Sequence, residues 1–397
     1  MKKIKISTAI ALILLACATT VNVTLLMSYD MINSKLSEYQ TMQKELAKIY
    51  EVMQVIEQSY VGEIDYETAL DYAAAGYVEG IGDSWSYYMN QEQYEQYLTD
   101  AGENLVGIGV NVVYDYNEEA ILVTKVYDKS PALYGGVQKF DYIISVDGQK
   151  VSDVGYNTAV DMVTGERGTV VELEVMRNDE IIEMRITRDT VARVSVYYEM
   201  VGEVAYVQIT NFESDTANQF KNALEITSNA GAKGFVFDLR NNPGGYLTKL
   251  VECLDIILPE GDVISTVSKY GSEEIYTSDA EYLDVPISVI VNSNSYSAAE
   301  FFAAAVQEYG VGTVVGESTT GKGYSQSPVE LSDGSVIILS TNKYYTPQGR
   351  NLANVGVTPD IQIEHSEEEQ ERYYFLTTQT DSQIVAAVDA VLSQIKE

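Results

Sequence analysis

The chain has 397 residues, of which 46% are hydrophobic, so it can bury two or three packed cores. Its 59 acidic residues against 25 basic ones give a formal net charge of −34, which repels nucleic-acid phosphates and leaves no basic surface to bind them. We therefore expect a globular protein of several domains without a nucleic-acid partner.

Residues 1–30 are expected to act as an export signal. Three lysines among the first five residues precede an uncharged, apolar run over residues 7–27, which is typical of such signals. Because the run approaches the ~20 residues that span a bilayer, we favour an uncleaved anchor with the rest of the chain outside the cytoplasm. Lipidation at Cys17 and cleavage after residues 16–18 are the alternatives, and both also place the rest outside.

Residues 31–103 predict a helical N-terminal region. Apolar side chains between Leu36 and Tyr60 recur at steps of three and four residues, which is the spacing of one helix face. Shorter helices are expected over residues 66–80 and 91–99. The apolar face of the long helix is either the seam of a homodimer or a surface that packs on the rest of the chain, and the sequence leaves both open.

Residues 104–190 predict a small β module that opens on the turn Gly107-Ile108-Gly109-Val110. Such a turn can present backbone N–H groups to the terminal carboxylate of a peptide, while the neighbouring strand edge pairs with the extended tail. A lone turn of this kind is most often structural. Its interpretation as a peptide site depends on two segments that follow in order, Ser-Pro-Ala at 130–132 and residues 140–148.

Together these segments resemble a PDZ domain of the bacterial protease type, over about 85 residues. The resemblance implies a module that binds the C-terminal tails of proteins. Two arginines, Arg167 and Arg177, are candidates for sensing a bound carboxylate, and the sequence does not choose between them. The predicted strands of the module cover residues 120–126, 142–146 and 170–176.

Residues 191–365 alternate strands and helices, which predicts an α/β layer fold. Loops at strand ends carry the ligands in such folds, so chemistry is expected after Leu239, Val291 and Glu317. An acidic linker and a C-terminal helix are expected over residues 366–397. The predicted strands cover residues 204–209, 234–239, 286–291 and 312–317, and the predicted helices cover 216–230, 247–257 and 297–309.

Cysteine and histidine are scarce. Cys253 is the one cysteine outside the export signal, so the chain offers no structural disulfide. The single histidine, His365, lies in an acidic stretch that we expect to be a solvated linker or the start of a helix. We therefore expect no metal and no cofactor, and a Ser-His-Asp triad would have only this poorly placed imidazole.

Ser297 is the candidate nucleophile. It opens a helix directly after a predicted buried strand, near the positive end of the helix dipole and beside N–H groups that can receive an oxyanion. The same serine begins the capping-box pattern Ser-Ala-Ala-Glu that ends at Glu300, and on this pattern alone a helix cap is the favoured interpretation.

Lys322, 25 residues later, is the candidate general base. Its flanking glycines allow the loop to bring a long side chain back toward the helix, although most lysines of this kind are surface residues. As a base it must be neutral, so burial has to lower its pKa by ~3 units from a reference of about 10.4. Gln326 can accept a hydrogen bond from the amine without raising that pKa as a carboxylate would, although a lone glutamine here is most often structural.

The segments 238–245, 292–300 and 321–326, preceded by the PDZ-like module and followed by residues 344–361, resemble the carboxy-terminal processing, or tail-specific, protease family. The resemblance covers about residues 40–362. It implies a multi-domain α/β protein in which a helical N-terminal region and an inserted PDZ-like β module accompany an α/β serine protease core.

In this family the matching residues imply a catalytic triad of Ser297, Lys322 and Gln326. The resemblance further implies an oxyanion hole formed by the N–H of Ala298 with that of Gly244 or Gly245. Two segments depart from the family pattern. Tyr296 stands where the family has a small alanine, and residues 82–87 match a structural segment only loosely, so we expect neither departure to remove a catalytic group.

The function implied is an extracytoplasmic serine endopeptidase that recognises protein C-terminal tails and is tied to the membrane by its N-terminal segment. The alternative is a catalytically silent PDZ adaptor that binds tails at the cell surface. The intact Ser297, Lys322 and Gln326 argue against the adaptor. A metal- or cofactor-dependent hydrolase is a further rival, for which the sequence shows no ligand cluster.

Overall fold

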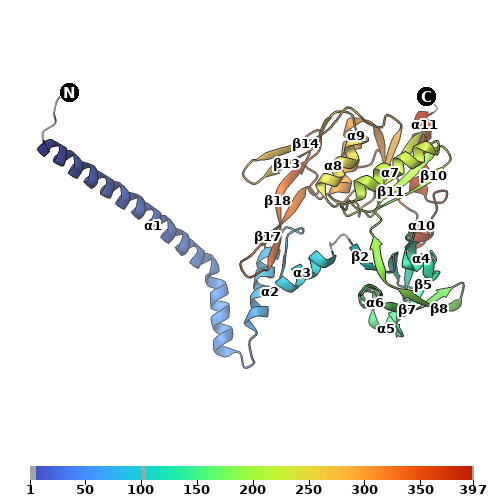
Figure 1. Ribbon diagram of the computed structural model, residues 1–397, viewed down its shortest axis with the longest axis horizontal. Coiled ribbons are helices and arrows are strands. Elements are labelled where there is room, and N and C mark those ends of the chain that lie inside the picture. The colour runs from blue at the N-terminus through green and yellow to red at the C-terminus, as the bar shows by residue number, and fades with distance from the viewer. Residues whose placement is uncertain (1–5, 101–103, 396–397) are drawn as a thin grey trace. The chain divides into compact units, whose positions relative to one another are not determined.

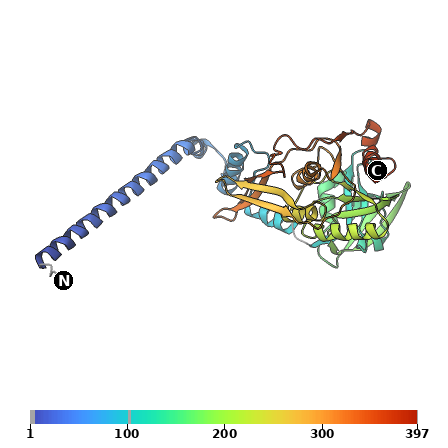
Figure 2. The same cartoon turned by 90° about the horizontal axis from the view of Figure 1, so that it is seen from above.

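The computed structural model describes residues 6–100 and 104–395, in two compact units, Met1–Ala73 and Ala74–Glu397 (Figure 1). The first unit consists largely of helix α1 (Ile6–Ser59), an unbroken helix in both views (Figure 1 and Figure 2). Its segment Leu14–Asn33 is long and apolar enough to cross a membrane. Residues 6–30 of the predicted export segment and the predicted amphipathic helix are therefore parts of one helix, and the large apolar side chains that the structure describes on its second half are exposed.

A six-stranded sheet forms the centre of the second unit, in the order β10-β11-β12-β15-β16-β19. β10 and β11 pair antiparallel and all other pairs are parallel. The predicted strands of this layer are confirmed, with ends that differ by at most one residue. The strands are β10 (Val196–Val201), β11 (Val204–Ile209), β12 (Gly234–Asp238), β15 (Ile287–Val291), β16 (Gly312–Gly316) and β19 (Ile361–Gln362).

Helices cover both faces of this sheet. Phe235 and Phe237 of β12 pack into one core with α7, α8 and α9, whereas Val236 between them packs with α11. The strand is apolar throughout because its alternating side chains enter two separate cores. The helices are α7 (Thr216–Asn229), α8 (Leu247–Asp255), α9 (Ala298–Tyr309) and α11 (Ser382–Ile395).

A second, antiparallel sheet lies beside the first and was not predicted. It runs β1-β18-β13-β14, with β17 also paired to β18. Strand β1 comes from the helical N-terminal region, yet Tyr87 pairs with Ile338 far along the chain. This sheet brings the segment before β1 next to the strand that carries Gln326. The strands are β1 (Tyr87–Met89), β13 (Gly261–Ser268), β14 (Glu273–Ser278), β17 (Tyr324–Glu330) and β18 (Val336–Tyr345).

The predicted β module has its own sheet, in the order β3-β4-β5-β7-β8 with β6 paired to β5, and its own apolar core. Strand β3 (Val110–Asp115) is an edge strand, which leaves one side open to pairing. The other elements are β2 (Asn104–Gly107), β4 (Ala120–Val126), β5 (Tyr142–Val146), β6 (Gln149–Lys150), β7 (Val170–Arg177), β8 (Glu180–Thr187), β9 (Asp189–Ala192), α4 (Pro131–Gly135), α5 (Val151–Val154) and α6 (Tyr156–Val163).

Four short elements complete the fold. Helices α2 (Tyr66–Glu79) and α3 (Gln91–Asp100) confirm the two shorter helices predicted in the N-terminal region. Helix α10 (Glu367–Glu371) and the 3-10 turn η1 (Tyr373–Phe375) lead into α11.

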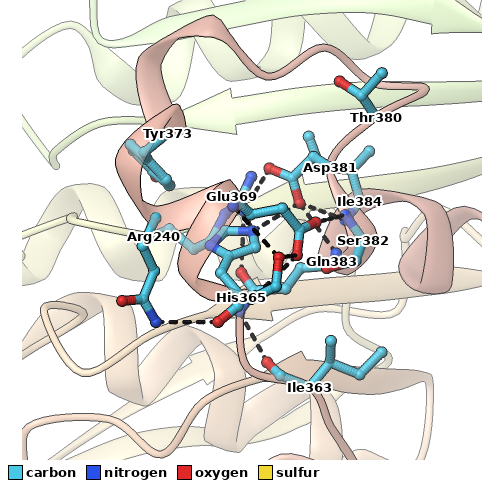
Figure 3. A network of polar contacts seen from close by, with 12 residues as sticks. Arg240, Ile363, His365, Glu369, Tyr373, Thr380, Asp381, Ser382, Gln383 and Ile384 are labelled. Carbon is cyan, nitrogen blue, oxygen red and sulfur yellow. Dashed lines mark hydrogen bonds and ion pairs between the residues drawn. The ribbon is translucent and has the colours of Figure 1, made fainter.

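A buried ionic network anchors this C-terminal segment to the end of β12 (Figure 3). The Arg240 guanidinium donates to Asp238 at 2.6 Å and to Asp381 at 2.8 Å, and all three side chains are buried. Burial alone would raise the pKa of Asp381, but the Arg240 charge and a hydrogen bond with His365 hold that pKa below its usual value.

The expectation of a solvated His365 was wrong. Its side chain is buried, with Nε2 3.1 Å from Oδ1 of Asp381, because the imidazole fills the same network (Figure 3). The alternative expectation of a helix start holds one residue later, where Ser366 caps α10.

Candidate active site

Ser297 lies at the junction between the loop after β15 and helix α9. Its φ is 58°, a left-handed conformation that costs energy for a residue with a side chain. Its backbone N–H donates to Oε2 of Glu300 at 2.9 Å, so the glutamate half of the predicted capping box forms. A strained, half-buried serine at a helix start is an arrangement that packing alone would not favour.

Glu300 has a larger role than a helix cap. Its fully buried carboxylate accepts hydrogen bonds from two further backbone N–H groups, Gly321 at 2.6 Å and Lys322 at 2.7 Å, and from the Thr319 hydroxyl at 2.5 Å. A buried carboxylate needs donors of this number and kind to offset its lost hydration. One oxygen, Oε2, thus joins the backbone of Ser297 to that of Lys322.

The Lys322 side chain is half-buried between aromatic rings. Its Nζ lies 4.4 Å from the ring centroid of Trp85 and 5.8 Å from that of Tyr296. Burial lowers the pKa of Lys322, and the nearby Asp83 and Glu300 carboxylates oppose that shift. In the described part of the chain, this amine makes no hydrogen bond to Ser297 or Gln326.

Gln326 sits on β17, next to a register shift in its pairing with β18. Its Nε2 donates to the Tyr324 carbonyl at 3.1 Å and to Oγ of Ser340 at 3.2 Å. The Ser340 N–H donates in turn to the hydroxyl of Ser86 at 3.0 Å. Gln326 is therefore linked to the segment before β1, which we had expected to be structural.

That segment, residues 81–86, is the part of the site that sequence reasoning missed. It lines a cavity of about 400 Å³ together with the Lys322 loop and β18. The signal was present in the sequence, because a solitary tryptophan and an aspartate stood where the family pattern fitted loosely, but nothing local showed which residues they would meet. Other residues lining the cavity include Gly321, Tyr324, Leu339 and Ser340.

The predicted oxyanion loop packs against Ser297, the candidate nucleophile. Gly244 has φ 93°, and a Cβ there would lie 2.8 Å from Cβ of Ser297, so only glycine fits. The Gly244 N–H already donates to Oδ1 of Asn242 at 2.8 Å. Within the described residues, the N–H groups of Gly245 and Ala298 donate to no protein acceptor. For Ala298 this is expected, because it is the first residue of α9 and the first N–H groups of a helix have no partner within it.

The predicted peptide-binding turn, Gly107-Ile108-Gly109-Val110, connects β2 to the edge strand β3. Gly109 has φ 81°, and a Cβ there would lie 2.5 Å from Cβ of Ser130, the residue that caps α4. The turn and the Ser-Pro-Ala segment therefore pack together, which explains why they occur in one pattern.

The two candidate arginines of the module differ in their positions. Arg167 donates to Asp189 at 2.5 Å, and Asp189 is the β-sheet partner of Gly107 in the turn. Arg177 instead pairs with the buried Asp141 at 2.6 Å. Arg167 is thus close to the turn, whereas Arg177 holds a structural carboxylate.

The described residues contain no group of three or more His, Cys, Asp or Glu side chains that could hold a metal ion.

Comparison with known proteins decides the family. The N-terminal domain of the activating protease CtpB matches residues 9–93, a PDZ domain matches residues 98–176, and peptidase family S41 matches residues 203–363. A probable CtpA-like serine protease of Staphylococcus epidermidis is 33% identical over 89% of this chain and 72% of its own length. The chain belongs to peptidase family S41.

Within S41, the similarity is to carboxy-terminal processing proteases with a PDZ domain. The carboxy-terminal processing protease CtpA of Bacillus subtilis is 33% identical over 80% of this chain and 68% of its own. The structure of the photosystem II D1 C-terminal processing protease matches with a TM-score of 0.50 and 25% identity, covering 79% of this S41 protease and 86% of that one.

A putative S41 protease from Bacteroides fragilis shares the fold, with a TM-score of 0.57 and 15% identity over 81% of this chain and 90% of the other. The predicted family and the multi-domain α/β architecture are therefore confirmed. The roles of individual residues in this S41 protease stay predictions.

Replacing Glu300 by glutamine tests whether this carboxylate holds the site together. The side-chain amide of glutamine would place an NH₂ donor where the carboxylate oxygen now accepts from backbone N–H groups. The loop at 319–322 should therefore move, and kcat should fall about 100-fold. Peptidase assays and amide hydrogen exchange of Gly321 and Lys322 measure the two effects. Glu308→Gln, on the same helix but bonded to Arg350, is the matched control and should keep its activity. An unchanged kcat in Glu300→Gln would contradict the proposed link.

Proposed function

We propose that this S41 protease is an extracytoplasmic endopeptidase that recognises substrates by their C-terminal tails and cleaves them with Ser297, Lys322 and Gln326. The observation that carries the proposal is the convergence of Ser297 and Lys322 on one carboxylate oxygen of Glu300. The backbones of two candidate residues 25 positions apart in sequence are thereby joined through one buried carboxylate.

In this mechanism the neutral amine of Lys322 removes the proton from the Ser297 hydroxyl as Oγ attacks the substrate carbonyl carbon. The resulting ammonium returns the proton to the leaving amine when the peptide bond breaks. A water molecule then attacks the acyl-serine, with the lysine again as base, and releases the acid. Gln326 is proposed to orient the amine once the lysine reaches the serine.

The oxyanion formed in each step needs preorganised donors. We assign the N–H of Ala298 as one of them, since it opens α9 and points out of the first helical turn. Of the two glycines, Gly245 is the better second donor, because the N–H of Gly244 is committed to Asn242. The cavity beside the lysine loop leaves room for a substrate side chain.

Alanine substitution of the triad tests the mechanism. A tagged protein with an apolar C-terminus should be cleaved by the full chain in detergent, whereas Ser297→Ala and Lys322→Ala should each lose at least about 1000-fold in kcat. Because a protonated lysine cannot accept a proton, wild-type activity should fall as pH drops through the lysine pKa. Equal cleavage by all three proteins would contradict the mechanism, and tail binding without cleavage by the wild type would favour the adaptor.

Tail recognition is proposed to use the turn at Gly107–Val110 and the open edge of β3, with Arg167 sensing the carboxylate. Its ion pair with Asp189 lies on the surface, so the guanidinium is free to change partners. Arg167→Gln should weaken binding of a fluorescent peptide with a free C-terminus about 10-fold. Arg185→Gln removes a comparable surface ion pair with Glu172 and serves as the control. Equal effects of the two substitutions would rule out a specific role for Arg167.

The extracytoplasmic location is proposed from helix α1, whose span at Leu14–Asn33 follows an N-terminus rich in lysine. An uncleaved anchor predicts a full-length chain that stays in membranes after alkaline extraction and is digested by protease added to intact spheroplasts. Cys17→Ala should change neither result. If a lipid on Cys17 held the chain instead, this substitution would remove the attachment point and the chain would leave the membrane fraction. Protection of the chain from added protease would contradict the proposed location.

A further inference from the structure

The amine of Lys322 lies against two aromatic rings that come from distant parts of the chain. Nζ is 4.4 Å from the centroid of Trp85 and 5.8 Å from that of Tyr296, and the two rings contact each other at 5.4 Å with planes tilted by 35°. Trp85 precedes β1, and Tyr296 immediately precedes the candidate nucleophile. The two departures from the family pattern thus meet at one side chain, the candidate base.

Trp85 is firmly held. Its backbone N–H donates to Oδ1 of Asp83 at 3.1 Å, and the other oxygen of that carboxylate accepts a hydrogen bond from the Ser86 hydroxyl at 2.5 Å. Ser86 accepts the N–H of Ser340 on β18 at 3.0 Å, and β1 pairs with β18 from Tyr87 onward. The backbone that carries the indole is therefore tied to β18, in the antiparallel sheet that also carries Gln326.

The groups around the Lys322 amine have opposite effects on its charge. An ammonium over an indole face is stabilised by the ring quadrupole, most strongly for tryptophan. The carboxylates of Asp83, from the segment before β1, and Glu300, from α9, also favour the charged form, whereas burial favours the neutral one. A base that activates Ser297 must be neutral and must reach the hydroxyl, yet in the described residues the amine is bonded to neither Ser297 nor Gln326.

We propose that Trp85 is a positioning residue that holds the protonated side chain of Lys322 off Ser297, so that the lysine has to leave the indole before it can act as the base. The inference rests on the proposed role of Lys322. Tyr296 forms the second wall of this resting position. Release exchanges the indole contact for hydrogen bonds to the serine and Gln326.

The chain has a single tryptophan, so its emission reports this contact directly. In the full-length protein, fluorescence should titrate with pH as Lys322 loses its proton, because the ammonium interacts with the indole π system. Lys322→Met keeps the length and apolar character of the side chain without the charge, and this transition should disappear. The same titration in wild type and Lys322→Met would overturn the proposal, and this readout needs no catalytic activity.

The pH dependence of cleavage provides the second test. Trp85→Leu keeps an apolar side chain without the π face, so the acidic limb of the kcat/KM profile should move down by about one pH unit. Below the limb this corresponds to a rate increase of up to about 10-fold. Trp85→Phe should shift it less, since its quadrupole is weaker but remains. Tyr87 is an exposed aromatic residue that begins β1, so Tyr87→Leu is the control and should leave the limb unmoved.

An acidic limb that stays in place or moves to higher pH in both Trp85→Phe and Trp85→Leu would overturn the role of Trp85. Lys322→Ala separates this failure from that of the proposed function. If Lys322→Ala still cleaves, the lysine is not the base and the mechanism itself fails. If Lys322→Ala is inactive while the Trp85 variants behave as wild type, the mechanism stands and the inference about the indole alone fails.

Discussion

Four donors surround the buried carboxylate of Glu300, and the geometry of the candidate active site depends on this one group. A carboxylate removed from water is costly unless donors replace its hydration, so the N–H groups of Ser297, Gly321 and Lys322 are drawn to it. Its place in the first turn of α9 adds the favourable field of the helix dipole. Both the strained serine and the start of the lysine loop are positioned by this requirement.

A second buried charge lies at the end of β12, next to the loop that approaches the site. Arg240 follows β12 and is shared between Asp238 and Asp381, which fastens the C-terminal segment to the central sheet. The next residue, Asn241, accepts side-chain hydrogen bonds from Asn292 and Asn294 in the loop that leads to Ser297. The Arg240 network fixes the chain before the turn at Gly244, and the Asn241 hydrogen bonds fix the loop before Ser297. The turn can therefore pack closely against the serine.

The sequence predicted most of the central layer because its information is local. An apolar strand such as β12 or β15 and an amphipathic helix such as α7 are recognisable from the spacing of their own residues. The second sheet lacked such a signal, since its strands pair across long sequence separations, as β1 does with β18. The prediction for His365 was wrong for a related reason. Its acidic neighbours indicate the helix that follows, whereas the ion network around the imidazole comes from residues far away in the sequence.

The candidate residues and the family followed from the sequence alone, because Ser297, Lys322, Gln326 and the glycine turn lie in short motifs whose order is specific. Only the tertiary structure showed that Glu300 joins the serine to the lysine loop, that the N–H of Gly244 is already occupied, and that Trp85 covers the lysine amine. These are contacts between segments far apart in the chain. They depend on where packing places buried charges and rings, and the spacing of residues along one segment does not encode that.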